Sequence, residues 1–144
     1  MTPAKTVVQL DGRAKVYRPL PEAERAEAML AGLRHHARGE AFEAHEAWEP
    51  AWMGTDDVGE RALIQGLIKL AAADVHASRG NPAGVARNLE GALQRLRSAE
   101  AAGVASAPGV VLDLAALIHL AVDQLAHASA GGATPSIAIP WRPA

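Results

Sequence analysis

A short segment, Phe-Glu-Ala-His-Glu-Ala-Trp-Glu at positions 42–49, holds the residues best suited to chemistry. On a helix, His45 and Glu49 lie one turn apart, and Glu46 and Glu49 are neighbours at a spacing of three. The three side chains therefore project from one side of the helix, the side that also carries Phe42. We expect a histidine and two carboxylates among bulky apolar groups to be partly desolvated, which suits acid–base chemistry or metal binding.

The pattern is similar to half of a zinc-peptidase helix, in which two histidines four residues apart flank a catalytic glutamate. Glu49 stands where the second histidine would be, so the motif is incomplete. A further ligand would have to come from another helix, and His76, with Gln65 on the same helix as a further binding residue, is the nearest contributor. This alternative is a metal-dependent hydrolase or metal-binding module that holds Zn, Mn or Fe through His45, Glu49 and His76. Glu46 would then be the general base.

Buried polar side chains more often hydrogen-bond one another than catalyse. The first hypothesis is therefore a non-enzymatic helical domain in which His45, Glu46 and Glu49 form a buried cluster that is structural or a binding site. A second alternative is a small-ligand pocket lined by Trp48 or Trp52. Together these hypotheses leave open whether the protein is an enzyme and whether it forms a homo-oligomer.

Two further groups of histidines have simpler interpretations. His119, Asp123 and His127 repeat at spacings of four, which is the period of any exposed helix face and favours a polar stripe over a metal site. His35 and His36 lie near the end of a predicted helix, where a favourable interaction with the helix dipole explains them.

Composition sets the class of protein. The chain has 144 residues, of which 49% are hydrophobic and 21% charged, as expected for one globular domain. The absence of cysteine excludes disulfides, thiolate metal ligands and cysteine nucleophiles. With 14 basic and 16 acidic residues the net charge is −2, so a broad basic face for nucleic acid is not expected.

No apolar run reaches the roughly 20 residues that a membrane-spanning helix needs, so no membrane partner is predicted. Residues 1–10 lack the apolar core of a signal peptide, which leads us to expect a cytoplasmic protein.

The elements that must position these residues are predicted to be helices, because alanine is abundant and long stretches lack proline. We predict a single-domain, all-α bundle of about five helices. It comprises an N-terminal extended or hairpin segment over 1–20, a helical domain over 21–131 and a proline-containing tail over 132–144.

Local signals give the approximate bounds. In the N-terminal segment, Asp11-Gly12 separates two short strand-like runs and is typical of a hairpin turn. The five helices are expected to begin near Pro21, Glu40, Val58, Pro82 and Val110, with a linker over 101–109. Pro50 either kinks the second helix or ends it near Trp48. The third helix, over about 58–78, has an apolar face and a second side of small residues, which predicts that it is the central helix.

Three motifs in order resemble a known family. The run 38–49 resembles the signature of the bacterial domain-of-unknown-function 309 family, in which a glycine precedes a Phe-Glu-Ala-His-Glu helix. The run 63–71 is similar to that family's Gln-Gly-Leu-Ile-Gln type helix, with Lys69 in place of the second glutamine. His76 and the run 79–84 match in type and spacing. The resemblance covers about 22–101 and implies an all-helical fold without an established activity.

The motif positions include His45, Glu46, Glu49, Gln65 and His76. The departure at Lys69 puts a cation among these polar residues, and it would weaken metal binding unless the cation pairs with one of the glutamates.

Overall fold

The computed structural model describes residues 5–132 and 135–144, so positions 1–4 of the N-terminal segment and 133–134 of the tail lie outside the described residues. Its helices are α1 (Glu22–Ala37), α2 (Ala41–Met53), α3 (Val58–Ser78), α4 (Pro82–Ala101) and α5 (Leu114–Ser129). Its strands are β1 (Lys5–Val8), β2 (Ala14–Tyr17), β3 (Ser106–Ala107), β4 (Val110–Leu112) and β5 (Trp141–Pro143). The fold is predominantly helical as predicted, but it is not purely all-α, because the strands form two small antiparallel sheets.

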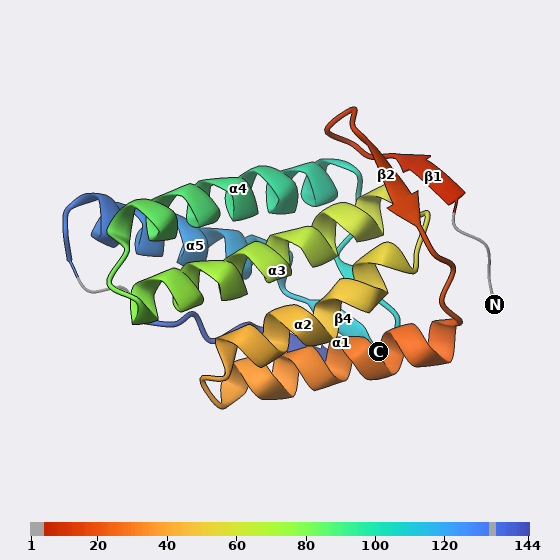
Figure 1. Ribbon diagram of the computed structural model, residues 1–144, viewed down its shortest axis with the longest axis horizontal. Coiled ribbons are helices and arrows are strands. Elements are labelled where there is room, and N and C mark those ends of the chain that lie inside the picture. The colour runs from red at the N-terminus through yellow and green to blue at the C-terminus, as the bar shows by residue number, and fades with distance from the viewer. Residues whose placement is uncertain (1–4, 133–134) are drawn as a thin grey trace.

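Helix α3 is the centre of the molecule, as its sequence predicts. In Figure 1 it runs between α2 and α4, while α1 covers α2 and α5 lies behind α4. The helix begins where Asp57 Oδ1 accepts a hydrogen bond from the Glu60 amide at 2.8 Å. The second, small-residue side allows α4 to approach closely, since a Cβ on Gly66 would lie 2.5 Å from Leu96 Cδ2.

Helices α1 and α2 pack closely because a large side chain of α2, Trp48, lies against a glycine of α1, Gly32. The Trp48 ring of α2 is fully buried and lies so close to Gly32 of α1 that a Cβ there would overlap it. Helix α2 runs through Pro50 without ending at Trp48, and it ends at Met53 with Gly54 as its C-cap. The largest fully buried apolar side chains come from all five helices and β4: Trp48, Met29, Leu63, Ile64, Leu67, Leu89, Leu96, Leu117 and Val110. No helix in the described ranges has both the length and the apolar character needed to cross a bilayer.

The N-terminal hairpin is confirmed. Strands β1 and β2 pair antiparallel with Val8 opposite Ala14, and the turn contains Gly12 at a φ of +82°. Asp11 Oδ1 accepts a hydrogen bond from the Arg13 amide at 2.9 Å and closes the turn. An isolated hairpin is marginally stable, so it depends on contacts with the helices.

The second sheet corrects the predicted linker and the predicted start of the fifth helix. Val110 and Val111 lie in β4, which pairs with β3 on one side and with β5 from the tail on the other. Two adjacent β-branched residues favour a strand, and Asp113 then caps α5 by accepting a hydrogen bond from the Ala116 amide. Residues 135–140 of the tail belong to no helix or strand, and the chain then enters β5.

Candidate functional site

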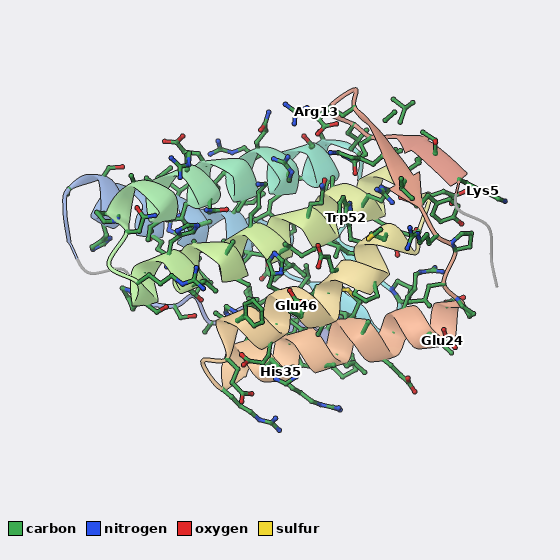
Figure 2. The ribbon with its side chains drawn as sticks, viewed as in Figure 1. Lys5, Arg13, Glu24, His35, Glu46 and Trp52 are labelled. Atoms are coloured by element: carbon green, nitrogen blue, oxygen red, sulfur yellow. The ribbon has the colours of Figure 1, made fainter. Side chains whose placement is uncertain are left out.

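The candidate site lies on the outer side of α2. Ala44, Trp48 and Ala51 form the buried stripe of this helix. Because these residues recur at helical spacing, the neighbouring stripe that contains His45 and Glu49 is turned toward the surface. Figure 2 shows the side chains along this part of α2.

Helix geometry brings three metal-competent side chains together. One ligand atom from each of His45, Glu46 and Glu49 lies within 4.8 Å of the other two. The His45 Nδ1 atom is 3.5 Å from Glu46 Oε1, and this nitrogen is shielded from solvent without a hydrogen-bond partner. The arrangement is a compact set of one imidazole nitrogen and two carboxylate oxygens.

The cluster is less buried than its sequence suggests. The Glu46 side chain is 55% exposed and that of His45 is 30% exposed. Phe42, expected to help enclose the cluster, is 57% exposed. The predicted enclosure fails because the buried stripe of α2 is carried by alanines and Trp48, which leaves Phe42 on the outside. Glu46 is therefore not a buried polar group whose removal would leave core atoms unpaired.

The two residues expected from α3 lie elsewhere. His76 faces α4, where its Nδ1 atom lies 3.0 Å from Asn81 Nδ2 and its ring lies against Gly84. Gln65 lines a separate pocket between the hairpin, α3 and α4. Helix α3 thus presents these side chains toward α4 rather than toward α2. The ligand set of His45, Glu49 and His76 is not brought together.

The cation introduced at Lys69 also points away from the cluster. Its side chain lies against Gly91 of α4. Burial, together with the nearby charge of Arg95, lowers the pKa of Lys69. It therefore does not oppose a cation on α2.

The two tryptophans serve packing and hydrogen bonding. Trp48 has no exposed surface, and its Nε1 donates to the Met29 carbonyl at 3.2 Å. Trp52 is half-buried and donates from Nε1 to Gln9 Oε1 at 3.2 Å. Burial leaves Trp48 no surface with which to line a ligand pocket.

The stripe on α5 lies in solvent, as predicted. The His119 and Asp123 side chains are 77% and 60% exposed, with 3.6 Å between Nε2 and Oδ2. His127 Nδ1 donates to the backbone carbonyl of Asp123 at 2.9 Å. These residues form no metal-sized group of three within the part of the chain that the structure describes.

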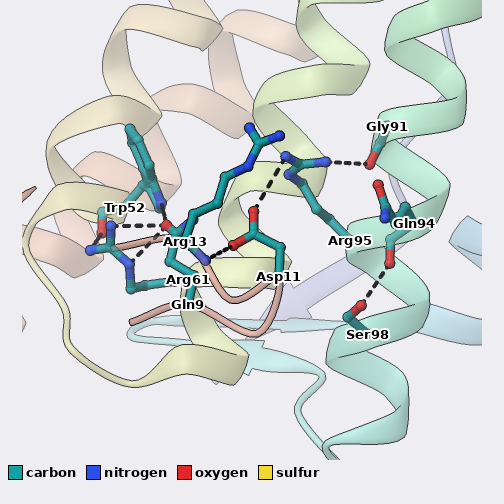
Figure 3. A network of polar contacts seen from close by, with 9 residues as sticks. All are labelled: Gln9, Asp11, Arg13, Trp52, Arg61, Gly91, Gln94, Arg95 and Ser98. Carbon is teal, nitrogen blue, oxygen red and sulfur yellow. Dashed lines mark hydrogen bonds and ion pairs between the residues drawn. The ribbon is translucent and has the colours of Figure 1, made fainter. Parts of the chain in front are cut away.

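The sequence does not reveal one feature at the centre of the fold: Arg61 of α3 is fully buried. Its guanidinium donates to Gln9 Oε1 from both Nε and Nη2, and Nη1 donates to the carbonyls of Trp52 and Thr55. The Trp52 ring lies 5.1 Å from Arg61 Cζ, and burial lowers the pKa of the guanidinium. Figure 3 shows Gln9 of the hairpin reaching this group. Arg61 therefore fastens the hairpin and the α2–α3 loop to α3.

A second missed cluster holds the tail. His36 is buried and donates from Nε2 to the Ile137 carbonyl at 2.6 Å, while Ser136 Oγ donates to Asp74 Oδ2 at 2.7 Å. Burial raises the pKa of Asp74, although the Ser136 hydrogen bond and the nearby His36 act in the opposite direction. The position of His36 near a helix end suggests only an interaction with the helix dipole, but the residue is buried and also holds the tail through the Ile137 carbonyl.

The residue types in this cluster are those of a catalytic triad, but their hydrogen bonds differ. The Ser136 hydroxyl donates to the Asp74 carboxylate, and the His36 Nε2 proton is directed at the Ile137 carbonyl. Ser136 Oγ, 3.4 Å from Nε2, therefore faces a protonated nitrogen. His36 therefore does not act as the base that would activate Ser136. The cluster attaches the extended tail to α1 and α3.

Comparison with known proteins agrees with the motifs. The family model described as a domain of unknown function (DUF309) matches residues 29–88. This segment includes most of α1, all of α2 and α3, and the first part of α4. No curated protein and no solved structure shows significant similarity to the chain. The resemblance in the sequence is confirmed over residues 29–88, the segment that matches the DUF309 family model.

Proposed function

We propose that the DUF309 segment binds a divalent transition-metal ion on α2 through His45, Glu46 and Glu49. The observation that carries this proposal is the close approach of their three ligand atoms, all within 4.8 Å of one another. A bound cation would also give the shielded His45 Nδ1 atom the partner that it lacks.

The donor set suits a borderline metal such as Zn, Mn or Fe. Imidazole nitrogen is a good ligand for zinc and iron, and carboxylate oxygen also suits manganese. All three ligands come from one helix, and Glu46 is largely exposed, so the remaining coordination positions would be open to water. The site is therefore an open one, rather than the closed cage of a structural metal.

This assignment uses Glu46 as a ligand and not as a general base. In the zinc-peptidase pattern the glutamate stands apart from the ligands and activates a water molecule. Here a Glu46 oxygen belongs to the same compact group as the His45 and Glu49 atoms. The geometry supports a binding module more directly than it supports a hydrolase.

The test is calorimetric titration of chelator-treated, full-length protein with Zn²⁺ and Mn²⁺, for wild type and His45→Ala. We expect about one ion per chain for the wild type and at least a tenfold loss of affinity in the variant, since removing one of three ligands costs more than about 1.4 kcal/mol. His119→Ala is the matched control, because His119 also has a nearby carboxylate but stands on α5.

Two outcomes would contradict the proposal: no binding by the wild type, or equal losses in His45→Ala and His119→Ala. Glu46→Ala separates binding from folding. Its side chain is exposed, so the variant should keep its free energy of unfolding within about 0.5 kcal/mol while binding the metal more weakly.

A further inference from the structure

A small pocket of mixed polar and apolar lining lies between the N-terminal hairpin, α3 and α4. It is bounded by the turn of the hairpin, the first half of α3 and the second half of α4, and its volume is about 120 Å³. Its polar lining residues are Gln9, Asp11, Gln65, Gln94, Arg95 and Ser98. Figure 3 shows Asp11 on the hairpin pointing toward Arg95 on α4, with Gln94 and Ser98 on the same helix as Arg95.

The side-chain amide of Gln9, which lines this pocket, is held in one orientation, so its NH₂ group is a fixed hydrogen-bond donor. Its Oε1 atom accepts from Arg61 Nε, Arg61 Nη2 and Trp52 Nε1, at 3.0–3.2 Å. An amide with its oxygen facing three donors has its NH₂ group on the opposite side. The Gln9 side chain is buried, with 6% of the residue exposed, and its Nε2 atom has no hydrogen-bond partner. An unpaired donor buried in this way is costly unless a ligand or water accepts from it.

One cation and one carboxylate line the pocket, and two further cations lie near these lining residues. Arg95 lines it, and Arg61 lies directly behind Gln9. Lys69 lies against Gly91, whose carbonyl accepts a hydrogen bond from Arg95 Nη1, so the two cations are close neighbours. Burial is the main cause of the lowered pKa of Lys69, and the charge of Arg95 is the second.

One carboxylate, Asp11, opposes these cations without neutralising them fully. Its Oδ2 atom lies 3.9 Å from Arg95 Nη2, which is longer than a hydrogen bond. The Arg95 Nε atom is buried and unpaired. The pKa of Asp11 is lowered, chiefly by the hydrogen bond from the Arg13 amide and also by Gln9 and Arg95. Asp11 thus already interacts with the Gln9 amide and with Arg95, although Gln9 Nε2 and Arg95 Nε have no hydrogen bond of ordinary length.

We propose that this pocket binds a small oxoanion, with Gln9 Nε2 and Arg95 as its principal donors. A water molecule takes up about 30 Å³ of liquid, so the pocket has room for an ion of four or five non-hydrogen atoms such as acetate or phosphate. Charge-assisted hydrogen bonds from a guanidinium and a fixed amide are well suited to carboxylate or phosphate oxygens. Asp11 competes with the ligand for Arg95.

The experiment is an NMR titration of the full chain with inorganic phosphate at constant ionic strength, which follows the Gln9 side-chain amide. We expect a saturable shift of this signal. Arg95→Gln should weaken binding at least tenfold, whereas Asp11→Asn should tighten it severalfold, because it removes the competing charge while keeping the turn. Arg97→Gln, at an exposed arginine of the same helix, is the control and should leave binding unchanged.

Weaker phosphate binding by Arg95→Gln together with tighter binding by Asp11→Asn would show that the anion binds in this pocket. A nonspecific attraction of anions to the protein surface would not give these opposite changes. Equal weakening in Arg95→Gln and Arg97→Gln, a shift that never saturates, or weaker binding in Asp11→Asn would overturn the proposal. A parallel titration with acetate separates the sources of the anion. A higher affinity for acetate would assign the pocket to carboxylates, and a higher affinity for phosphate would assign it to phosphoryl groups. The site is independent of the metal site on α2, so either can fail alone.

Discussion

The hairpin and the tail are fastened to the helical body by buried polar groups of different kinds. Gln9 of the hairpin binds Arg61, whose guanidinium stays charged throughout the pH range in which proteins fold. The tail is held through His36 and through Asp74, a carboxyl group that takes up a proton as the pH falls. The attachment of the tail to the helices therefore depends on pH, whereas the attachment of the hairpin does not.

The two attachments also differ in how many groups depend on them. Arg61 donates to an amide oxygen and to two backbone carbonyls, so it joins three segments of chain. His36 donates to one carbonyl of the tail. We expect the first attachment to contribute more to the stability of the whole domain than the second.

The largest effect should come from Arg61→Met. This change leaves the Trp52 and Thr55 carbonyls without their Arg61 donor, and it removes two of the three donors to Gln9 Oε1. Each unpaired buried acceptor costs about 1–3 kcal/mol, and partial rehydration lowers the total to about 3–5 kcal/mol. Urea denaturation measures the loss, with the exposed Arg97→Met as a control that should stay within about 0.5 kcal/mol. If Arg61→Met lowered the free energy of unfolding by less than about 1 kcal/mol, the hairpin attachment would not contribute more to stability than the tail attachment.

A smaller effect is expected from His36→Phe. The Phe ring would keep the packing on Trp48, which now has a centroid distance of 6.2 Å, but the Ile137 carbonyl would lose its donor. The expected cost is about 1–3 kcal/mol in the same denaturation experiment. The adjacent His35→Phe is the control, since it removes only a partly exposed ion pair with Glu40 and should cost about 0–1 kcal/mol. Equal costs in the two variants would show that the Ile137 hydrogen bond contributes nothing specific.

The smallest effect, and the one that separates the attachments by pH, concerns Asp74→Asn. The pKa of Asp74 is raised above its ordinary value of 3.8 in the folded state. Between 3.8 and the raised value the folded protein keeps a proton that the unfolded chain loses, so the free energy of unfolding falls as the pH rises through this window. Asparagine carries no such proton and still accepts from Ser136.

Denaturation of wild type and Asp74→Asn across this pH range should therefore show the variant gaining stability relative to wild type as the pH rises. The difference should level off above the raised pKa. The same comparison for Arg61→Met and wild type should show no step in this window. A stability difference between Asp74→Asn and wild type that does not change with pH would contradict the assignment of the pH dependence to the tail.

The parts of the fold that depend on local signals could be predicted from the sequence. Helix α3 has the predicted bounds, and α4 begins at Pro82 behind the Asn81 cap, because caps and prolines act on neighbouring residues. The grouping of His45, Glu46 and Glu49 follows in the same way from spacing along one helix.

The parts of the fold that depend on contacts between residues far apart in the chain could not be predicted from the sequence. Val110 joins a strand instead of a helix because its partner in the sheet is Pro143. His76 lies away from α2 because its side of α3 faces α4. For Arg61 a weak signal existed: it stands three residues before Ile64, on a face that is otherwise apolar. Neither its burial nor its partner Gln9 follows from that spacing alone.

The pairing of β4 with β5 makes α5 part of a closed loop. The base of this loop is held by the strand pairs, by the bond from the Asp113 amide to the Pro140 carbonyl and by the bond from the Ala144 amide to the Gly109 carbonyl. Such a loop opens as one cooperative unit, so the amide protons at its base should exchange with solvent at a shared rate. Domain swapping of α5 between two copies of the chain would therefore require exchange of the whole segment from β4 to β5, and not of the helix alone.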